Sequence, residues 1–229
     1  MGIDYTNVMK DKTAYLSKDE IQRMLQHCLD NDNMRDYILI RTLYHTGRRI
    51  TEIVGEKPYT RKVGLRPCDI HDEELIEFDI LKKHHVKRKN LITGKKLSDE
   101  KLNELRIKKM PKRSLKAIDD FYMGLLLAYI EDEGIKYDKR VFPITARRAR
   151  EIIKRIAIKC NITRSKGFIH PHNFRHSFAI HLLKDNPNDT GILRQVQELL
   201  DHQDINMTMT YAQFTQEDKK DTLNKTFKK

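Results

Sequence analysis

The segment His170–Tyr211 holds most of the candidate functional residues of the chain, and it reads HPHNFRHSFAIHLLKDNPNDTGILRQVQELLDHQDINMTMTY. Proline is favoured at the first position of a helix, so we expect a helix to begin near Pro171. His172 and Arg175 then stand three positions apart, and side chains at this spacing leave the same face of a helix. The two groups are therefore placed to bind one anion together.

The second half of the segment predicts two helices with a break between them. Apolar residues recur at helical spacing over Gly191–Leu200, which puts His202 just past a helix end. On one unbroken helix, nine residues at about 100° each would place Tyr211 opposite His202. The two side chains can converge only if the chain turns between them. Asp204 is a suitable N-cap, so we predict a new helix from about Met207.

The kinds of side chain in this segment favour phosphoryl transfer over acyl transfer. The planar guanidinium of arginine matches the non-bridging oxygens of a phosphodiester and stabilises the charge that grows as phosphorus becomes five-coordinate. Histidine donates to the same oxygens or moves a proton. A tyrosine hydroxyl is a weak nucleophile until cations surround it, and here they would.

A second motif with arginine follows an apolar segment early in the chain. Residues 34–45 are predicted to form a buried helix, which Gly47 ends because glycine is the usual residue just past a helix. The sequence Thr46-Gly-Arg-Arg-Ile-Thr-Glu52 spans this end. A guanidinium beside a helix end, held by a carboxylate such as Glu52, is pre-organised for phosphate. An isolated Arg-Arg pair, by contrast, is usually just solvated.

Both motifs resemble those of the tyrosine recombinases, also called the phage integrase family. His172-Asn-Phe-Arg175-His-Ser-Phe-Ala-Ile-His-Leu-Leu is similar to the second box of that family, and Thr46-Gly-Arg-Arg49-Ile-Thr-Glu52 is similar to the first. In the first box the arginine two residues after the glycine is catalytic. The resemblance assigns that role to Arg49 and not to Arg48.

The end of the segment also resembles the family, with one departure. Leu199-Leu-Asp-His202, followed nine residues later by Tyr211, is similar to the stretch that joins the last active-site histidine to the nucleophile. The family usually has glycine before that histidine, whereas this chain has Asp201. Aspartate can also sit at a helix end, so the resemblance holds.

The middle of the chain predicts a hairpin with a very basic tip. Residues 75–81 alternate well enough for a strand, and Leu105–Met110 is the expected partner. From Lys82 to Arg113 the sequence has thirteen Lys or Arg against three acids, which suits a phosphate backbone. By the resemblance, the lysine that protonates the leaving 5′ oxygen falls on Lys82, with Lys83 as the alternative.

Further helices complete the expected fold. Ser17-Lys-Asp-Glu20 is a capping box that opens a helix, residues 114–130 are amphipathic, and Thr145 caps a basic helix. The prediction is a mostly helical α+β fold with a small antiparallel sheet at one edge, similar to the tyrosine recombinase catalytic domain. Residues 1–15 are expected to be a leader or linker and residues 16–229 that domain, without the N-terminal core-binding domain that usually precedes it.

Composition points to nucleic acid and to a reducing compartment. Lys and Arg outnumber Asp and Glu by 45 to 33, which gives a net charge of +12 and favours a polyanionic partner. The three cysteines are far apart and the ten histidines lack zinc-ligand spacing, so no metal is expected. With no signal peptide or membrane span in the sequence, we expect a cytoplasmic protein that works with DNA.

The resemblance implies a complete reaction. A tyrosine attacks a phosphodiester of double-stranded DNA, two arginines bind the non-bridging oxygens, two histidines help with proton transfer and hydrogen bonding, and a lysine protonates the 5′ oxygen. The product is a 3′-phosphotyrosyl link that needs no cofactor to be rejoined. Self-association into a tetramer on DNA is also implied. The six residues concerned are Arg49, Lys82, His172, Arg175, His202 and Tyr211.

Two alternatives stay open from the sequence. A type IB topoisomerase uses a similar constellation and would relax DNA as a monomer. A basic DNA-binding protein with a vestigial site would not cut at all, although it would be expected to have lost at least one of these groups. Among the other histidines, His176 and His181 are interpreted as packed side chains on a half-buried helix. His170, beside Pro171, is a further candidate for the site.

Overall fold

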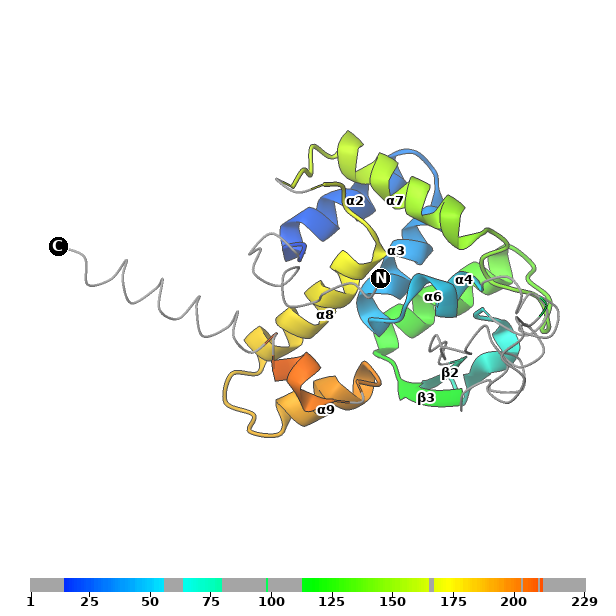
Figure 1. The fold of residues 1–229 in the computed structure, drawn as a ribbon. Coiled ribbons are helices and arrows are strands. Elements are labelled where there is room, and N and C mark those ends of the chain that lie inside the picture. Colours follow the sequence, from blue (N-terminus) through cyan, green and yellow to red (C-terminus); the bar gives the residue numbers. More distant parts are fainter. Residues whose placement is uncertain are drawn as a thin grey trace.

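The computed structural model describes residues 15–55, 64–79, 98, 113–164, 167–202, 204–209 and 211. Helices make up most of this part of the chain, and a small sheet lies at one edge of the helical body (Figure 1). The helices are α2 (Lys18–Asp30), α3 (Met34–Thr46), α4 (Ile50–Val54), α6 (Asp120–Asp132), α7 (Ala146–Lys159), α8 (Pro171–Asp185) and α9 (Ile192–Leu199). The predicted fold class is thereby confirmed.

Helix α3 is the central element of the fold. It is buried on several faces, as the buried run Tyr37–Ile40 and buried Leu43 illustrate, and a helix of that kind needs neighbours on more than one side. Helices α2, α4, α6 and α8 contact it. Its carboxyl end, where Gly47 adopts φ 59° as predicted, therefore lies deep inside the molecule.

Local capping signals set where the helices begin. Ser17 and Glu20 form the predicted capping box: the Ser17 hydroxyl accepts from the Glu20 amide at 3.1 Å, and the Glu20 carboxylate accepts from the Ser17 amide at 2.8 Å. Thr145 caps α7 by accepting from the Arg148 amide at 3.1 Å. Each cap satisfies an amide that the first turn leaves without an intrahelical partner.

The sheet corrects two predictions. Strands β1 (Ile70–His71), β2 (Leu75–Asp79) and β3 (Arg113–Ala117) are antiparallel in that order, with the turn η1 (Pro67–Asp69) before them. Strand β2 therefore pairs with β1 and β3, and its predicted partner, residues 105–110, lies outside the described residues. The helix predicted from residue 114 begins only at α6. The reason is that β3 completes the backbone hydrogen bonds of β2, while Asp119 is the actual cap.

Two apolar cores stabilise the described chain. The larger one combines α2, α3, α4, α6 and α7 with β2. The smaller one lies between α8 and α9 and includes Ile180, Val196, Leu200 and Tyr211. Because the first turns of α8 belong to the larger core and its middle to the smaller, this helix joins the two. None of the helices within the described ranges is long and apolar enough to cross a membrane.

Gly47 is expected to tolerate no side chain. A Cβ atom there would lie 2.7 Å from Phe178 Cδ1 and 2.9 Å from Leu200 Cδ2, on a backbone that L-residues rarely adopt. We predict that Gly47→Ala lowers the free energy of unfolding by about 2–4 kcal/mol, measured by urea denaturation.

Gly124→Ala is the matched control for this substitution. Gly124 lies in α6, and a Cβ atom there has nothing within 4 Å. This variant should be more stable than the original by about 0.5–1 kcal/mol because alanine costs less entropy in a helix. Equal stability of the two variants would contradict the packing argument.

Candidate active site

Helix α8 supplies the first two predicted site residues. Pro171 is its first residue, and the His170 amide before it donates to the Asn173 side chain at 2.8 Å, so the helix begins where predicted. His172 is exposed at the mouth of the site, whereas Arg175 is buried one turn further along. Both lie on the same face of α8, as their spacing requires.

The Arg175 side chain connects three segments of the chain by hydrogen bonds. Its Nη1 donates to the Gly47 carbonyl at 2.8 Å and its Nη2 to the Leu200 carbonyl at 2.6 Å. The first acceptor ends α3, and the second lies just past α9. The motif that follows α3 and the motif that follows α9 are therefore held against α8 by one guanidinium.

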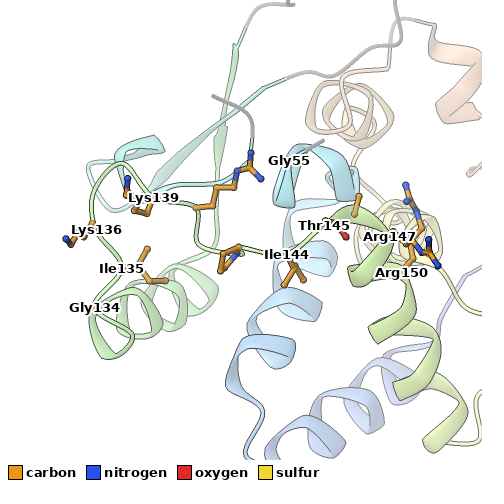
Figure 2. Close-up of a pocket in the computed structure, with 12 residues that line it drawn as sticks. Gly55, Gly134, Ile135, Lys136, Lys139, Ile144, Thr145, Arg147 and Arg150 are labelled. Atoms are coloured by element: carbon orange, nitrogen blue, oxygen red, sulfur yellow. The ribbon is translucent and has the colours of Figure 1, made fainter. Parts of the chain in front are cut away.

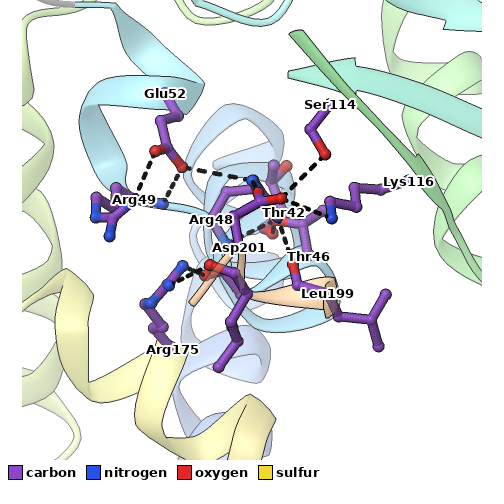
Figure 3. Close-up of polar contacts among 12 residues, drawn as sticks. Thr42, Thr46, Arg48, Arg49, Glu52, Ser114, Lys116, Arg175, Leu199 and Asp201 are labelled. Carbon is purple, nitrogen blue, oxygen red and sulfur yellow. Dashed lines mark hydrogen bonds and ion pairs between the residues drawn. The ribbon is translucent and has the colours of Figure 1, made fainter. Parts of the chain in front are cut away.

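The first of these motifs holds Arg49 beside α4. The Glu52 carboxylate accepts from the Arg49 amide at 3.0 Å and from Arg49 Nη1 at 2.9 Å. The Glu52 side chain is fully buried, and that of Arg49 is 25% exposed. The predicted orienting contact is confirmed, and it leaves the guanidinium partly open towards solvent (Figure 3).

The second motif brings His202 and Tyr211 together. The chain turns after α9, Asp204 accepts from the Asn206 amide at 2.9 Å, and residues 205–209 are helical. The predicted break is confirmed, although the new helix begins two residues earlier than expected. The rings of His202 and Tyr211 stack with centroids 6.0 Å apart, and His202 Nδ1 lies 2.9 Å from the Thr208 hydroxyl.

His176 is a site residue that the sequence interpretation missed. Its Nδ1 lies 3.0 Å from the hydroxyl oxygen of Tyr211, and both side chains are buried. The available signal was its position four residues after His172, which places the two rings on neighbouring turns of one helix face. By contrast, His181 hydrogen-bonds the Tyr44 hydroxyl at 2.8 Å and is structural, as interpreted.

Burial and neighbouring cations control protonation in the site. Burial, assisted by the charge of Arg49, lowers the pKa of Arg175 to about 10. Desolvation also lowers the pKa of His176 to about 3 and that of His172 to about 4, with smaller effects from nearby cationic groups. His172 is the more exposed of the two, so water solvates its charged form better. Near neutral pH both imidazoles are uncharged beside fixed guanidinium groups.

A basic hollow lies at the beginning of α7. It has a volume of about 990 Å³, and Thr145, Arg147 and Arg150 form one wall (Figure 2). The opposite wall includes Lys136 and Lys139. The charge of Arg150 also contributes, as the smallest of several causes, to the lowered pKa of His172.

The sixth predicted residue has no described position. Lys82 and its alternative Lys83 lie outside the described residues, as does most of the basic tip between β2 and β3. His170 lies near the site, with its ring 6.1 Å from that of His172 in an edge-on arrangement. The structure thus brings Arg49, His172, Arg175, His202 and Tyr211 into one region and leaves the lysine unplaced.

Comparison with known proteins identifies the family. The model of the phage integrase family matches residues 72–218. The chain belongs to the phage integrase family.

Curated relatives of this phage integrase family member are tyrosine recombinases. The tyrosine recombinase of Pseudothermotoga lettingae is 26% identical over 224 residues, which are 98% of this chain and 64% of the relative. The tyrosine recombinase XerC of Bacillus subtilis is 30% identical over 185 residues, 80% of this chain and 51% of the relative. The chain thus spans between about half and two thirds of the length of these relatives.

A solved structure has the same fold. The XerH site-specific recombinase, in a post-cleavage complex with a palindromic difH substrate, aligns with a TM-score of 0.60 and 18% identity. The alignment covers 92% of this chain and 52% of XerH.

The buried His176 predicts how the stability of this family member depends on pH. Because its folded pKa of about 3 lies below the unfolded value, the unfolded chain takes up the proton first as the pH falls. The contribution to stability is complete above about pH 6.5 and is lost towards pH 3, at up to roughly 1.4 kcal/mol per pH unit.

The variant His176→Asn should therefore have a flatter stability curve than the original protein between pH 6.5 and 4, even though it is less stable at pH 7. Urea denaturation at each pH measures both curves. Parallel curves would mean that His176 is not held neutral by the fold.

Proposed function

We propose that residues 16–229 form the catalytic domain of a site-specific DNA recombinase that cuts and rejoins DNA through a 3′-phosphotyrosyl intermediate. The observation that carries this proposal is the convergence of the buried Tyr211, His202 and Arg175 in one basic site. The tyrosine recombinases named above support it, since this chain aligns with them over most of its length.

The arginines act on the phosphate. Arg49 is held by Glu52 with its guanidinium partly open, so it binds non-bridging oxygens without having to be ordered first. Arg175 uses two of the five N–H donors of a guanidinium on backbone carbonyls, which fixes its plane. Both charges lie in a partly desolvated site, where they stabilise the five-coordinate transition state more than they would in water.

Tyr211 and the imidazoles carry out the displacement. The Tyr211 oxygen forms a bond to phosphorus while the bond from phosphorus to the 5′ oxygen breaks. The hydroxyl proton passes to a neutral imidazole, for which His172 and His202 are the predicted groups and His176 is the one in contact at 3.0 Å. Lys82, or Lys83 beside it, gives a proton to the departing 5′ oxygen.

Two consequences follow for the reaction cycle. The phosphotyrosyl link keeps the energy of the original bond, so a second 5′ hydroxyl reverses the chemistry without a cofactor. Tyr211 is only 3% exposed and its hydroxyl contacts His176, so residues 204–211 must shift for the oxygen to meet a phosphate.

Double-stranded DNA is the proposed partner. The net charge of +12 and the basic hollow beside α7 suit a phosphate backbone. The aligned XerH structure contains its own DNA substrate, and the fold shared with it supports DNA as the partner of this chain. We further propose that copies of the chain assemble as a tetramer on two duplexes, with DNA in the cytoplasm.

The first test is a covalent adduct. Incubated without metal with nicked suicide duplexes and supercoiled plasmid, the protein should form a protein–DNA adduct that survives a denaturing gel. Tyr211→Phe should abolish it because the attacking oxygen is gone. Tyr137→Phe, at a tyrosine that is 75% exposed, is the matched control and should leave it unchanged.

The other outcomes of this test favour one of the two alternative functions. Relaxation of the plasmid without strand exchange would favour a topoisomerase. Tight DNA binding with no adduct on any duplex, from protein with an intact fold, would contradict the proposal and favour a non-catalytic DNA-binding protein.

The second test concerns the hollow. The double variant Arg147→Gln/Arg150→Gln should bind duplex DNA more weakly and reduce the slope of log K against log salt by about 1–2, because two phosphate contacts are lost. Lys159→Gln, in the last turn of the same helix, is the control and should change neither quantity. Fluorescence anisotropy at several salt concentrations measures both. An unchanged slope in the double variant would place the DNA elsewhere.

A further inference from the structure

The carboxyl end of α9 is bound by three cations. The last carbonyls of any helix lack intrahelical partners and carry its partial negative charge. Here the carbonyl of Glu198 accepts from Lys116 Nζ, that of Leu199 from Arg48 Nη2, and that of Leu200 from Arg175 Nη2. The three donors come from β3, from the turn between α3 and α4, and from α8. Three elements far apart in the sequence thus meet at one helix end (Figure 3).

Asp201 adds a carboxylate at the same place. Its backbone has φ 50°, in the left-handed region that aspartate tolerates better than most residues. One carboxylate oxygen pairs with Arg48 Nη1. The other accepts from Lys116 Nζ at 3.0 Å and from the Ser114 hydroxyl at 3.1 Å. Arg48 and Lys116 therefore each bind both a carbonyl of α9 and the carboxylate that follows it.

Arg48 is an unusual residue to find at this position. Its side chain is completely buried, with the Phe78 ring 5.5 Å from its guanidinium and the Glu52 carboxylate 3.9 Å away. Taking a guanidinium and a carboxylate out of water costs about as much as their pairing returns, so an apolar pair would serve stability equally well. Stability alone does not explain a charged pair here.

The neighbours of the pair do explain it. Arg48 lies between Gly47, which accepts from Arg175, and Arg49. Asp201 lies between Leu200, which also accepts from Arg175, and His202. The pair therefore fixes the two backbone segments from which Arg49 and His202 project and whose carbonyls hold Arg175.

We propose that Arg48 and Asp201, together with Lys116, are positioning residues that set Arg49 and His202 against the scissile phosphate. They touch no substrate and act through the backbone that they hold. This inference deepens the proposed recombinase function and rests on it. We therefore expect replacement of the pair to change the stability of the fold little and to lower the cleavage rate strongly.

The main variant removes the whole pair. Arg48→Met/Asp201→Gly removes both members of the pair and suits the left-handed backbone at position 201, while Lys116 keeps the Glu198 carbonyl and Glu52 keeps Arg49 as partners. We expect single-turnover formation of the phosphotyrosyl adduct at saturating DNA to slow about 100-fold, as a misplacement near 1 Å does. The DNA dissociation constant and the cooperativity of unfolding should change little. A merely structural role would move these last two quantities instead.

Two further variants give the comparison. Asp201→Asn keeps an oxygen acceptor and a residue that tolerates positive φ, so its rate should lie between those of the original protein and the double variant. Lys18→Met/Asp185→Asn removes an exposed ion pair of 2.8 Å between α2 and α8, away from this network, and should cleave at the original rate. Adduct formation by the double variant at the original rate would overturn the proposal.

Hydrogen exchange does not depend on activity, so it tests the positioning role of Arg48 and Asp201 separately from the recombinase function. The His202 amide donates to the Gln197 carbonyl at 2.9 Å, and the Asp201 amide to the Glu198 carbonyl at 3.1 Å. Hydrogen exchange of the peptide covering residues 197–202 should be faster in the double variant, with α2 unchanged. Unchanged exchange in the 197–202 peptide would overturn the proposal. If the original protein forms no adduct but exchange responds as expected, the recombinase function fails and the pair still holds the backbone.

Discussion

The arrangement of the site depends on one buried guanidinium. Arg175 is almost completely removed from water, and a charge in that position needs strong acceptors. It finds them in the carbonyls of Gly47 and Leu200, at the ends of two helices that carry partial negative charge. Because both carbonyls are needed to satisfy the guanidinium, the site is complete only when α3, α8 and α9 are packed together.

The same burial determines the chemistry. A site that concentrates several guanidinium groups and excludes water keeps the neighbouring imidazoles neutral, as the lowered pKa values of His172 and His176 indicate. Neutral imidazoles can accept a proton, and fixed cations can attract a phosphate. These two capacities usually compete, since a protonated histidine would add charge but lose its basicity. In this site the imidazoles accept the proton, and the guanidinium groups supply the positive charge.

Features that depend on neighbours in the sequence were predictable from it. The capping box at Ser17, the glycine that ends α3 and the break between His202 and Tyr211 are each specified by a few adjacent residues, and all three are confirmed. The approximate position of Arg49 beside Glu52 was predictable for the same reason. The spacing of residues a few positions apart in the sequence is enough to predict such features.

Features that depend on distant partners were not predictable. The sequence from Ser114 was predicted to start a helix, and only pairing with the edge of β2 makes Arg113–Ala117 a strand. Arg48 was interpreted as the non-catalytic neighbour of Arg49, because no residue near it in the sequence indicates that Asp201 is its partner. Likewise, the contact between His176 and Tyr211 depends on how residues 204–211 return to α8.

The separation of Arg48 and Asp201 has a consequence for protein engineering. The two residues lie 153 positions apart in the chain yet form one contact. A chimera made with a relative by a single crossover between them would inherit one member of the pair and a foreign residue opposite it. Shuffled libraries should therefore take both positions from the same parent, even though neither one belongs to the proposed catalytic set.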